Sequence, residues 1–225
     1  MSEADFGAVM TVPQRAVFRF GRAVVWALSK VLFRIEVHGG EHVPKDGSFI
    51  LSPVHRSYLD MPLTVLVTRR IMRYMGKETL WNNWFGAFFL TSMGGFPVQR
   101  GTADREALRA CKVVLDRGEG LVMFPEGTRQ EGAIVDPELM HDGPAFMSGR
   151  AQVPIVPLGI GGSDRAMPPG QSLVFPRKIV LVVGPPLAPP AQTNGRVPRR
   201  LIREKTEELR QAVQAVYDEA QSRVG

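Results

Sequence analysis

The chain has 225 residues, of which 44% are hydrophobic and 22% charged, so it can build one sizeable core and does not have the composition of a disordered protein. The single cysteine, Cys111, excludes an intramolecular disulfide and any metal site made of several cysteines. The net charge of +6 favours an anionic partner, which could be a nucleic acid, a membrane surface or a phosphorylated substrate.

The first predicted element is an amphipathic helix over residues 12–35, where apolar residues recur at helical spacing. The face opposite this stripe carries basic residues with aromatic residues among them: Arg15, Arg19, Arg22, Lys30, Trp26 and Phe33. Such a helix fits a membrane interface, or it is a surface helix with a solvated basic face. The interleaved aromatics favour the membrane. We therefore expect residues 1–34 to associate with a membrane and residues 35–225 to form the main domain with a C-terminal helix.

Short apolar runs alternate with helical patterns along the rest of the chain. Strands are expected at residues 35–38, 49–52, 71–75, 96–98, 121–124, 153–160 and 178–183. Helices are expected at residues 61–68, 81–90, 102–117, 143–149 and 198–223. This alternation predicts the α/β class, with a mixed, mostly parallel sheet flanked by helices. The last helix should bury a stripe made of Ile202, Leu209, Val213, Val216 and Ala220.

Residues 80–99 contain no charged side chain and have the length of a membrane span. Polar residues, glycines and a proline interrupt the apolar character of this stretch, so we expect residues 81–90 to form a buried helix instead. An apolar wall of this kind could also line a slot for a lipid chain, although the pattern alone favours a plain core helix.

A histidine, His55, follows the strand expected at residues 49–52, and Asp60 comes five positions later. Five residues turn a continuous helix through about 500°, so the two side chains meet only if His55 precedes a helix and Asp60 lies in its first turn. Asp60 would then orient the imidazole and His55 would act as a general base. A cap, a surface ion pair or a core histidine gives the same spacing. His38 and His42 lack metal-ligand spacing and are expected to be structural.

A second polar group follows the strand expected at residues 121–124. Glycine allows a close backbone approach to an anion, threonine supplies a hydroxyl donor, and arginine offers a planar fork for phosphate oxygens. A turn with a surface arginine is the common alternative. Cations at the ends of other predicted strands favour a phosphate pocket. Its expected members are Arg100, Glu126, Gly127, Thr128 and Arg129, with Lys77 as a further candidate.

Four sequence blocks occur in the order of the four motifs of glycerolipid acyltransferases: residues 55–60, 95–100, 124–129 and 153–157. Over about residues 35–190 the chain resembles the 1-acyl-sn-glycerol-3-phosphate acyltransferase family. Four ordered blocks are far more specific than any one of them. Two positions depart from the pattern. Val54 stands where the family often has asparagine, and His141-Asp142-Gly143 stands where a basic residue often precedes the glycine.

The resemblance implies an enzyme that moves a fatty acyl chain from a thioester, on coenzyme A or acyl carrier protein, to the free hydroxyl of lysophosphatidic acid. In it His55 deprotonates the hydroxyl, Asp60 holds the imidazole, and the phosphate pocket binds the acceptor. Pro154 and Pro157 fall in the fourth block and are expected to shape the acyl or donor side. A thioester is already activated, so neither a nucleophilic cysteine nor a metal or other cofactor is expected.

The expected place of this activity is the cytoplasmic face of a membrane, with an anionic lipid surface as partner and no nucleic acid, for which no binding motif occurs. The start of the chain lacks the basic and then apolar order of a signal peptide, so export is not expected. Two alternatives stay open. One is the same chemistry on glycerol 3-phosphate or another lysophospholipid, and the other is a non-catalytic module that binds anionic lipid.

Overall fold

The computed structural model describes residues 9–98, 104–168, 171 and 173–225. The helices are α1 (Val12–Phe33), α2 (Asp60–Leu63), α3 (Trp84–Ser92), α4 (Asp104–Asp116), α5 (Gly143–Ala151), α6 (Ser163–Ala166) and α7 (Arg199–Val224). The strands are β1 (Glu36–His38), β2 (Phe49–Pro53), β3 (Met72–Lys77), β4 (Gly95–Val98), β5 (Gly120–Val122), β6 (Ile155–Gly161) and β7 (Val180–Val183). Short 3₁₀ turns cover Gly40–His42, Thr64–Leu66, Glu78–Trp81 and Pro137–Leu139.

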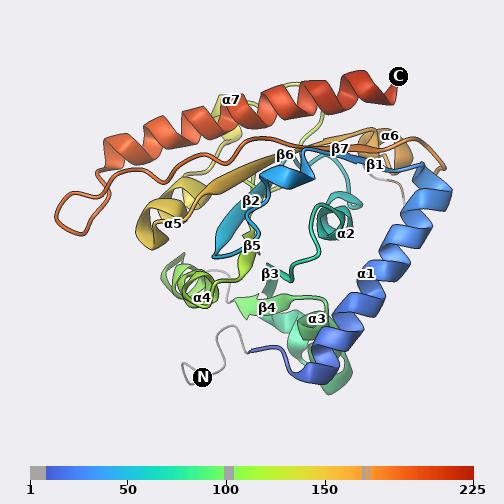
Figure 1. Ribbon diagram of the computed structural model, residues 1–225, viewed down its shortest axis with the longest axis horizontal. Helices are drawn as coiled ribbons and strands as arrows, with labels where there is room; N and C mark the ends of the chain where they lie inside the picture. The colour runs from blue at the N-terminus through green and yellow to red at the C-terminus, as the bar shows by residue number, and fades with distance from the viewer. Residues whose placement is uncertain (1–8, 99–103, 169–170, 172) are drawn as a thin grey trace.

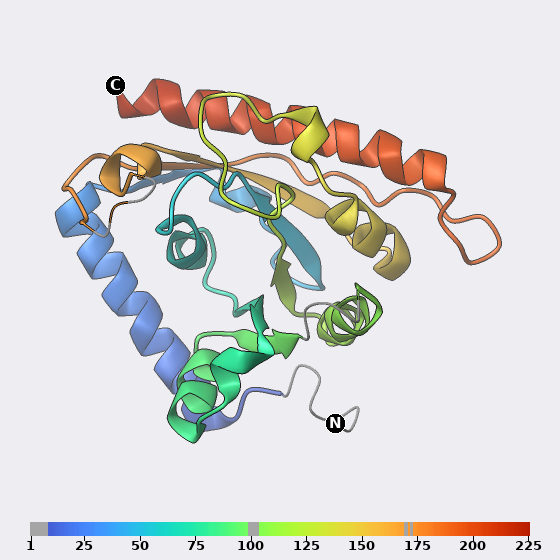
Figure 2. The same cartoon turned by 180° about the vertical axis from the view of Figure 1, so that it is seen from behind.

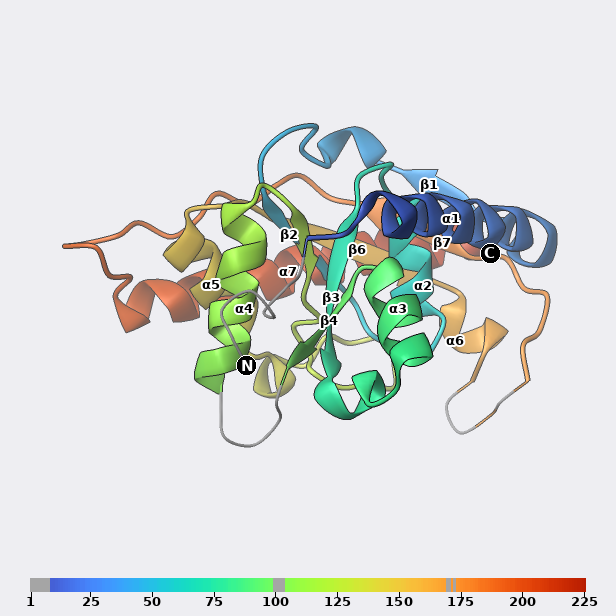
Figure 3. The same cartoon turned by 90° about the horizontal axis from the view of Figure 1, so that it is seen from below.

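All the strands belong to one sheet in the order β1-β7-β6-β2-β5-β3-β4 (Figure 1). Neighbouring strands run parallel except β6 and β7, which are antiparallel. Helices cover both faces: α4, α5 and α7 lie on one side and α1, α2 and α3 on the other (Figure 3). The predicted mixed, mostly parallel α/β sheet is therefore confirmed.

The C-terminal helix α7 packs closely on β6. Its five predicted inner residues are all buried. Two glycines of β6 make this approach possible, because a Cβ added at Gly159 would lie 2.1 Å from the carbonyl oxygen of Val216. The helix thus covers the sheet beside β2, the strand that leads to His55.

Helix α1 turns its apolar stripe away from the body of the protein. Phe18, Ser29 and Phe33 are its buried residues, whereas Phe20 is 71% exposed and Val31 is 79% exposed. The apolar residues expected to mark one face of this helix do form one face, and Phe20, Val24, Leu28 and Val31 on that face are exposed. None of the described helices is both long and apolar enough to cross a membrane.

Helix α3 is not the buried helix that the sequence predicted. Trp84 is 80% exposed, Phe85 65% and Phe89 50%. The helix is apolar on every side, so its periodicity could not show which side would be covered. Its main contacts are with α1, the preceding 3₁₀ turn and β4, and Figures 1 and 3 show it beside the N-terminal half of α1.

Candidate active site

His55 lies just beyond the carboxyl end of β2, in the middle of the sheet. Every residue of β2 is buried, and the next residue, Val54, donates its N–H to the Leu158 carbonyl at 2.9 Å. The Val54 side chain is fully buried. The backbone is therefore rigid up to His55, which lies at the carboxyl ends of the parallel strands, where ligands commonly bind.

His55 and Asp60 lie side by side, with His55 before a helix and Asp60 in the first turn of that helix, as the sequence spacing requires. Asp60 is the first residue of α2, and its Oδ2 lies 3.1 Å from Nδ1 of His55. The Asp60 side chain is fully buried, while 15% of the His55 side chain is exposed. Because a carboxylate only accepts hydrogen bonds, Nδ1 carries the proton of a neutral imidazole and Nε2 is left as the acceptor.

The same oxygen of Asp60 also fixes the loop that carries His55. It accepts the backbone N–H groups of Arg56 at 2.6 Å and Ser57 at 2.7 Å. On its other side, the His55 ring packs against Phe124, with ring centroids 4.1 Å apart. The imidazole is therefore held in orientation by a carboxylate, a pinned backbone and an aromatic ring. Such a pair can accept a proton from a hydroxyl group placed at Nε2.

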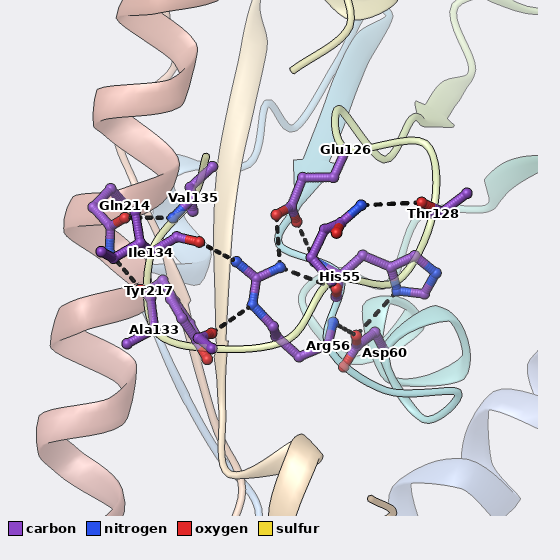
Figure 4. Close-up of polar contacts among 12 residues, drawn as sticks. His55, Arg56, Asp60, Glu126, Thr128, Ala133, Ile134, Val135, Gln214 and Tyr217 are labelled. Atoms are coloured by element: carbon purple, nitrogen blue, oxygen red, sulfur yellow. Dashed lines mark hydrogen bonds and ion pairs between the residues drawn. The ribbon is translucent and has the colours of Figure 1, made fainter. Parts of the chain in front are cut away.

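Glu126 lies behind His55 and not in a phosphate pocket (Figure 4). Its Oε2 accepts the His55 N–H at 2.9 Å, and its Oε1 pairs with the Arg56 guanidinium at 2.6 Å. Both side chains are almost fully buried. A buried carboxylate has no surface to offer a phosphate, whose negative charge it would also repel. This corrects the assignment of Glu126 to the acceptor's phosphate.

The sequence reasoning missed Arg56, whose guanidinium is the centre of the network in Figure 4. Its further donors reach the backbone carbonyl groups of His55, Gly132 and Ile134 at 3.0 to 3.1 Å. Its Cζ also lies 5.2 Å from the ring centroid of Tyr217 on α7. An arginine between two polar residues normally points to solvent, and nothing in the local pattern of apolar residues marks this one as buried.

A second connection joins the His55 loop to α7. The N–H of Gln130 donates to the His55 carbonyl at 2.9 Å. Further along, the side-chain amide of Gln214 on α7 accepts the N–H of Val135 at 2.7 Å and donates to the Ala133 carbonyl at 3.0 Å. Figure 2 shows the chain after β5 passing along α7 before it enters α5. The long C-terminal helix is thus tied through this segment to the loop of His55.

The turn after β5 exposes three of the predicted phosphate-binding residues. Gly127 has φ of +67°, and a Cβ there would lie 2.8 Å from the His141 ring, so both conformation and space require glycine. The Thr128 hydroxyl accepts a hydrogen bond from the Gln130 side chain at 3.0 Å. Arg129 is exposed, and its Cζ lies 3.5 Å from the ring centroid of Tyr58.

The remaining predicted site residues are not brought to His55 by the described structure. Arg100 and the side chain of Lys77 lie outside the described residues. Pro157 is buried within β6, opposite Ser52. The carbonyl of Pro154 accepts the Ile50 N–H at 3.0 Å, which places Pro154 at the other end of β2, about 15 to 20 Å from His55 at ~3.3 Å per residue. The expected place of both prolines at the acyl or donor side stays a prediction.

Cys111 and the histidines outside the site are structural in the described part of the chain. Cys111 is buried on α4, and burial raises the pKa of its thiol to about 12. His42 Nδ1 bonds to the Val183 carbonyl at 2.9 Å, and His38 pairs with Glu36 at 3.3 Å. Among the described residues, no three His, Cys, Asp or Glu side chains are grouped as metal ligands would be.

Comparison with known proteins assigns a family to this arrangement. The family described as Acyltransferase matches residues 34–161. A 1-acyl-sn-glycerol-3-phosphate acyltransferase of Bacillus subtilis (strain 168) is 27% identical over 155 residues, which cover 68% of this chain and 73% of that protein. The chloroplastic 1-acyl-sn-glycerol-3-phosphate acyltransferase BAT2 of Brassica napus is 24% identical over 174 residues, 75% of this chain but only 50% of that protein.

The fold has a counterpart among solved structures. The crystal structure of the 1-acyl-sn-glycerophosphate (LPA) acyltransferase PlsC from Thermotoga maritima matches with a TM-score of 0.69 and 24% sequence identity. The match covers 91% of this chain and 78% of that chain. At this level of identity the match supports the arrangement of the sheet and helices, and the sequence comparisons carry the family.

Proposed function

Since the chain belongs to the acyltransferase family, we propose that it transfers a fatty acyl chain from a thioester to the free hydroxyl of lysophosphatidic acid, giving phosphatidic acid. The donor thioester is carried by coenzyme A or by acyl carrier protein. The observation that carries the proposal is the 3.1 Å contact between His55 and a fully buried Asp60 at the carboxyl edge of the sheet. The names of the relatives supply the acceptor.

In the proposed reaction, Nε2 of His55 removes the proton of the acceptor hydroxyl as the oxygen attacks the carbonyl carbon of the thioester. The tetrahedral oxyanion collapses, the carbon–sulfur bond breaks, and the proton held on His55 passes to the departing thiolate. Asp60 stabilises the imidazolium that exists between these two transfers. General base catalysis of this kind contributes roughly a hundredfold to ten-thousandfold in rate.

We place the acceptor's phosphate at the turn of Thr128 and Arg129, close to His55. An exposed guanidinium can bind two phosphate oxygens side by side, and a hydroxyl can donate to a third. Arg100 and Lys77 are proposed as further cations of this pocket. The phosphate of the acceptor must lie near the base, because only one carbon and one oxygen separate the phosphorus from the carbon that bears the free hydroxyl.

We also propose that the protein works at the cytoplasmic face of a membrane, held there by α1 and α3. Both helices expose apolar or aromatic side chains that ordinary surface helices keep covered, such as Phe20 and Trp84. Arg15, Arg19 and Lys30 are exposed on α1 as well. Aromatic and basic side chains together suit an interface of anionic lipids, which are abundant on the cytoplasmic leaflet.

A crossed transfer assay tests the proposed function. Purified protein would be given lysophosphatidic acid, glycerol 3-phosphate or another lysophospholipid, each with acyl-CoA and acyl carrier protein donors of several chain lengths. The expected result is transfer to lysophosphatidic acid that is lost in His55→Ala, whose thermal unfolding stays close to that of the parent protein. Full transfer by His55→Ala would overturn the mechanism, and preference for another acceptor would replace lysophosphatidic acid.

A further inference from the structure

The guanidinium of Arg129 rests on the ring of Tyr58. The Arg129 Cζ lies 3.5 Å from the ring centroid, a distance at which a cation is strongly attracted to the face of an aromatic ring. Tyr58 is 52% exposed, so the two groups meet at the surface of the site and not in the core. With the residues that the structure describes, the Arg129 side chain makes no hydrogen bond or ion pair.

Stacking on a ring holds a guanidinium in place and leaves its N–H donors free to bind a ligand. All five N–H bonds of arginine lie in the plane of the group, and stacking uses only the face of that plane. All the N–H donors of Arg129 therefore remain available to bind two acceptor oxygens in the plane of the guanidinium. A free arginine would lose side-chain entropy on binding such a ligand, and the stack has already removed part of that freedom.

Tyr58 belongs to the same fixed loop as His55. On one side of it, the N–H of Ser57 donates to Asp60 at 2.7 Å, and on the other side the N–H of Leu59 donates to the Ser57 hydroxyl at 3.3 Å. The Ser57 hydroxyl is itself bonded to the Met167 carbonyl at 3.1 Å. The backbone that carries Tyr58 is therefore held by the carboxylate that orients the imidazole.

We propose that Tyr58 is a positioning residue, which presents the guanidinium of Arg129 to the phosphate of the acceptor at a fixed place relative to His55. This inference rests on the proposed function, because it takes the acceptor to be a phosphate ester. One loop then sets both the base and the distance from that base to the phosphate. Tyr58 itself does not bind the substrate or take part in the chemistry.

The experiment is a double-mutant cycle on steady-state transfer to lysophosphatidic acid. Tyr58→Leu removes the ring, Tyr58→Phe keeps it, and each is made in the parent protein and in Arg129→Gln. We expect Tyr58→Leu to raise the acceptor KM about threefold to fivefold, the upper part of the range that cation–π energies at exposed sites give, while kcat and the donor KM stay within about twofold. Tyr58→Phe should behave like the parent. In the Arg129→Gln background Tyr58→Leu should change the acceptor KM by less than about twofold.

The possible outcomes distinguish the positioning role of Tyr58 from the proposed function. A Tyr58→Leu protein that unfolds like the parent and has an unchanged acceptor KM would overturn the positioning role alone. Equal effects of Tyr58→Leu with and without Arg129 would also overturn it, since the ring would then act through something other than the arginine. Absence of transfer by the parent protein to any phosphate-bearing acceptor would overturn the proposed function together with this inference.

Discussion

Arg56 and Glu126 form an ion pair of 2.6 Å that is shut off from solvent on every side. The pair lies directly behind His55, because Glu126 also accepts the His55 N–H and Arg56 also donates to the His55 carbonyl. Buried pairs of this kind contribute little net stability while both partners are present. Removing one partner is costly, since it leaves the other charge buried without compensation.

The first prediction concerns this pair. Arg56→Met should lower the free energy of unfolding by about 3 to 5 kcal/mol, because the Glu126 carboxylate would be stranded in the interior. Adding Glu126→Leu should recover part of that loss. Urea denaturation of the single and double variants measures both effects. The matched control is Arg200→Met on α7, whose exposed pairing with Glu204 should be worth less than about 1 kcal/mol. Similar losses in Arg56→Met and Arg200→Met would contradict the prediction.

The second prediction concerns Asp60. In Asp60→Asn, a neutral amide replaces a carboxylate whose Oδ2 accepts three hydrogen bonds, and only the amide oxygen can take over those bonds. The imidazolium that forms during transfer then loses the negative charge that stabilises it, so kcat should fall roughly a hundredfold to ten-thousandfold with the acceptor KM little changed. The control is Asp136→Asn, an exposed helix cap, which should keep its kcat. A kcat close to that of the parent would separate Asp60 from catalysis.

Much of the fold could be predicted from local patterns. Every predicted strand is present, because short apolar runs rich in branched residues and bounded by turns usually form strands in an α/β chain. The meeting of His55 and Asp60 could also be predicted, since it depends on the end of one strand and the start of one helix. The end of this strand and the start of this helix lie within a few residues of each other, so their spacing in the sequence largely determines where the two side chains lie.

The errors share a different physical cause. Glu126 is assigned to the phosphate because it stands in an exposed-looking turn, but its burial depends on Arg56, which lies 70 residues away in the chain. The burial of Arg56 depends in turn on Tyr217 at the far end of the chain. Helix α3 is predicted to be buried because all its faces are apolar. Which of these faces is covered depends on how the helices and strands pack together. Contacts between residues far apart in the chain cannot be predicted from the local sequence pattern.

The third prediction concerns the exposed aromatic residues of α3. The double variant Trp84→Ser with Phe85→Ser should bind anionic vesicles on the order of tenfold more weakly, since two side chains that would enter the interface are removed. Vesicle flotation measures the bound fraction. Ile134→Ser is the control, because Ile134 is 72% exposed but lies in the segment that passes along α7. Equal binding by both variants would remove α3 from the proposed membrane face.

The last prediction concerns Cys111, whose thiol pKa is raised to about 12 by burial. The thiolate is the reactive form, so a raised pKa lowers reactivity at any lower pH. At pH 8 only about one thiol in ten thousand would be ionised, against roughly a quarter of free thiols with a pKa near 8.5. Iodoacetamide should therefore label the folded protein very slowly and the denatured protein quickly, as intact mass measurement would show.

The same burial separates Cys111 from the proposed chemistry. Cys111→Ala should retain the kcat of acyl transfer, because a thioester donor reacts directly with the acceptor hydroxyl and needs no enzyme thiol. Cys111→Ser should be less stable than Cys111→Ala, since a hydroxyl at this fully buried position costs free energy unless it finds a hydrogen-bond partner. Complete loss of transfer in a folded Cys111→Ala protein would instead point to an acyl-cysteine intermediate. Such an intermediate would trap labelled acyl groups on the protein when the acceptor is left out.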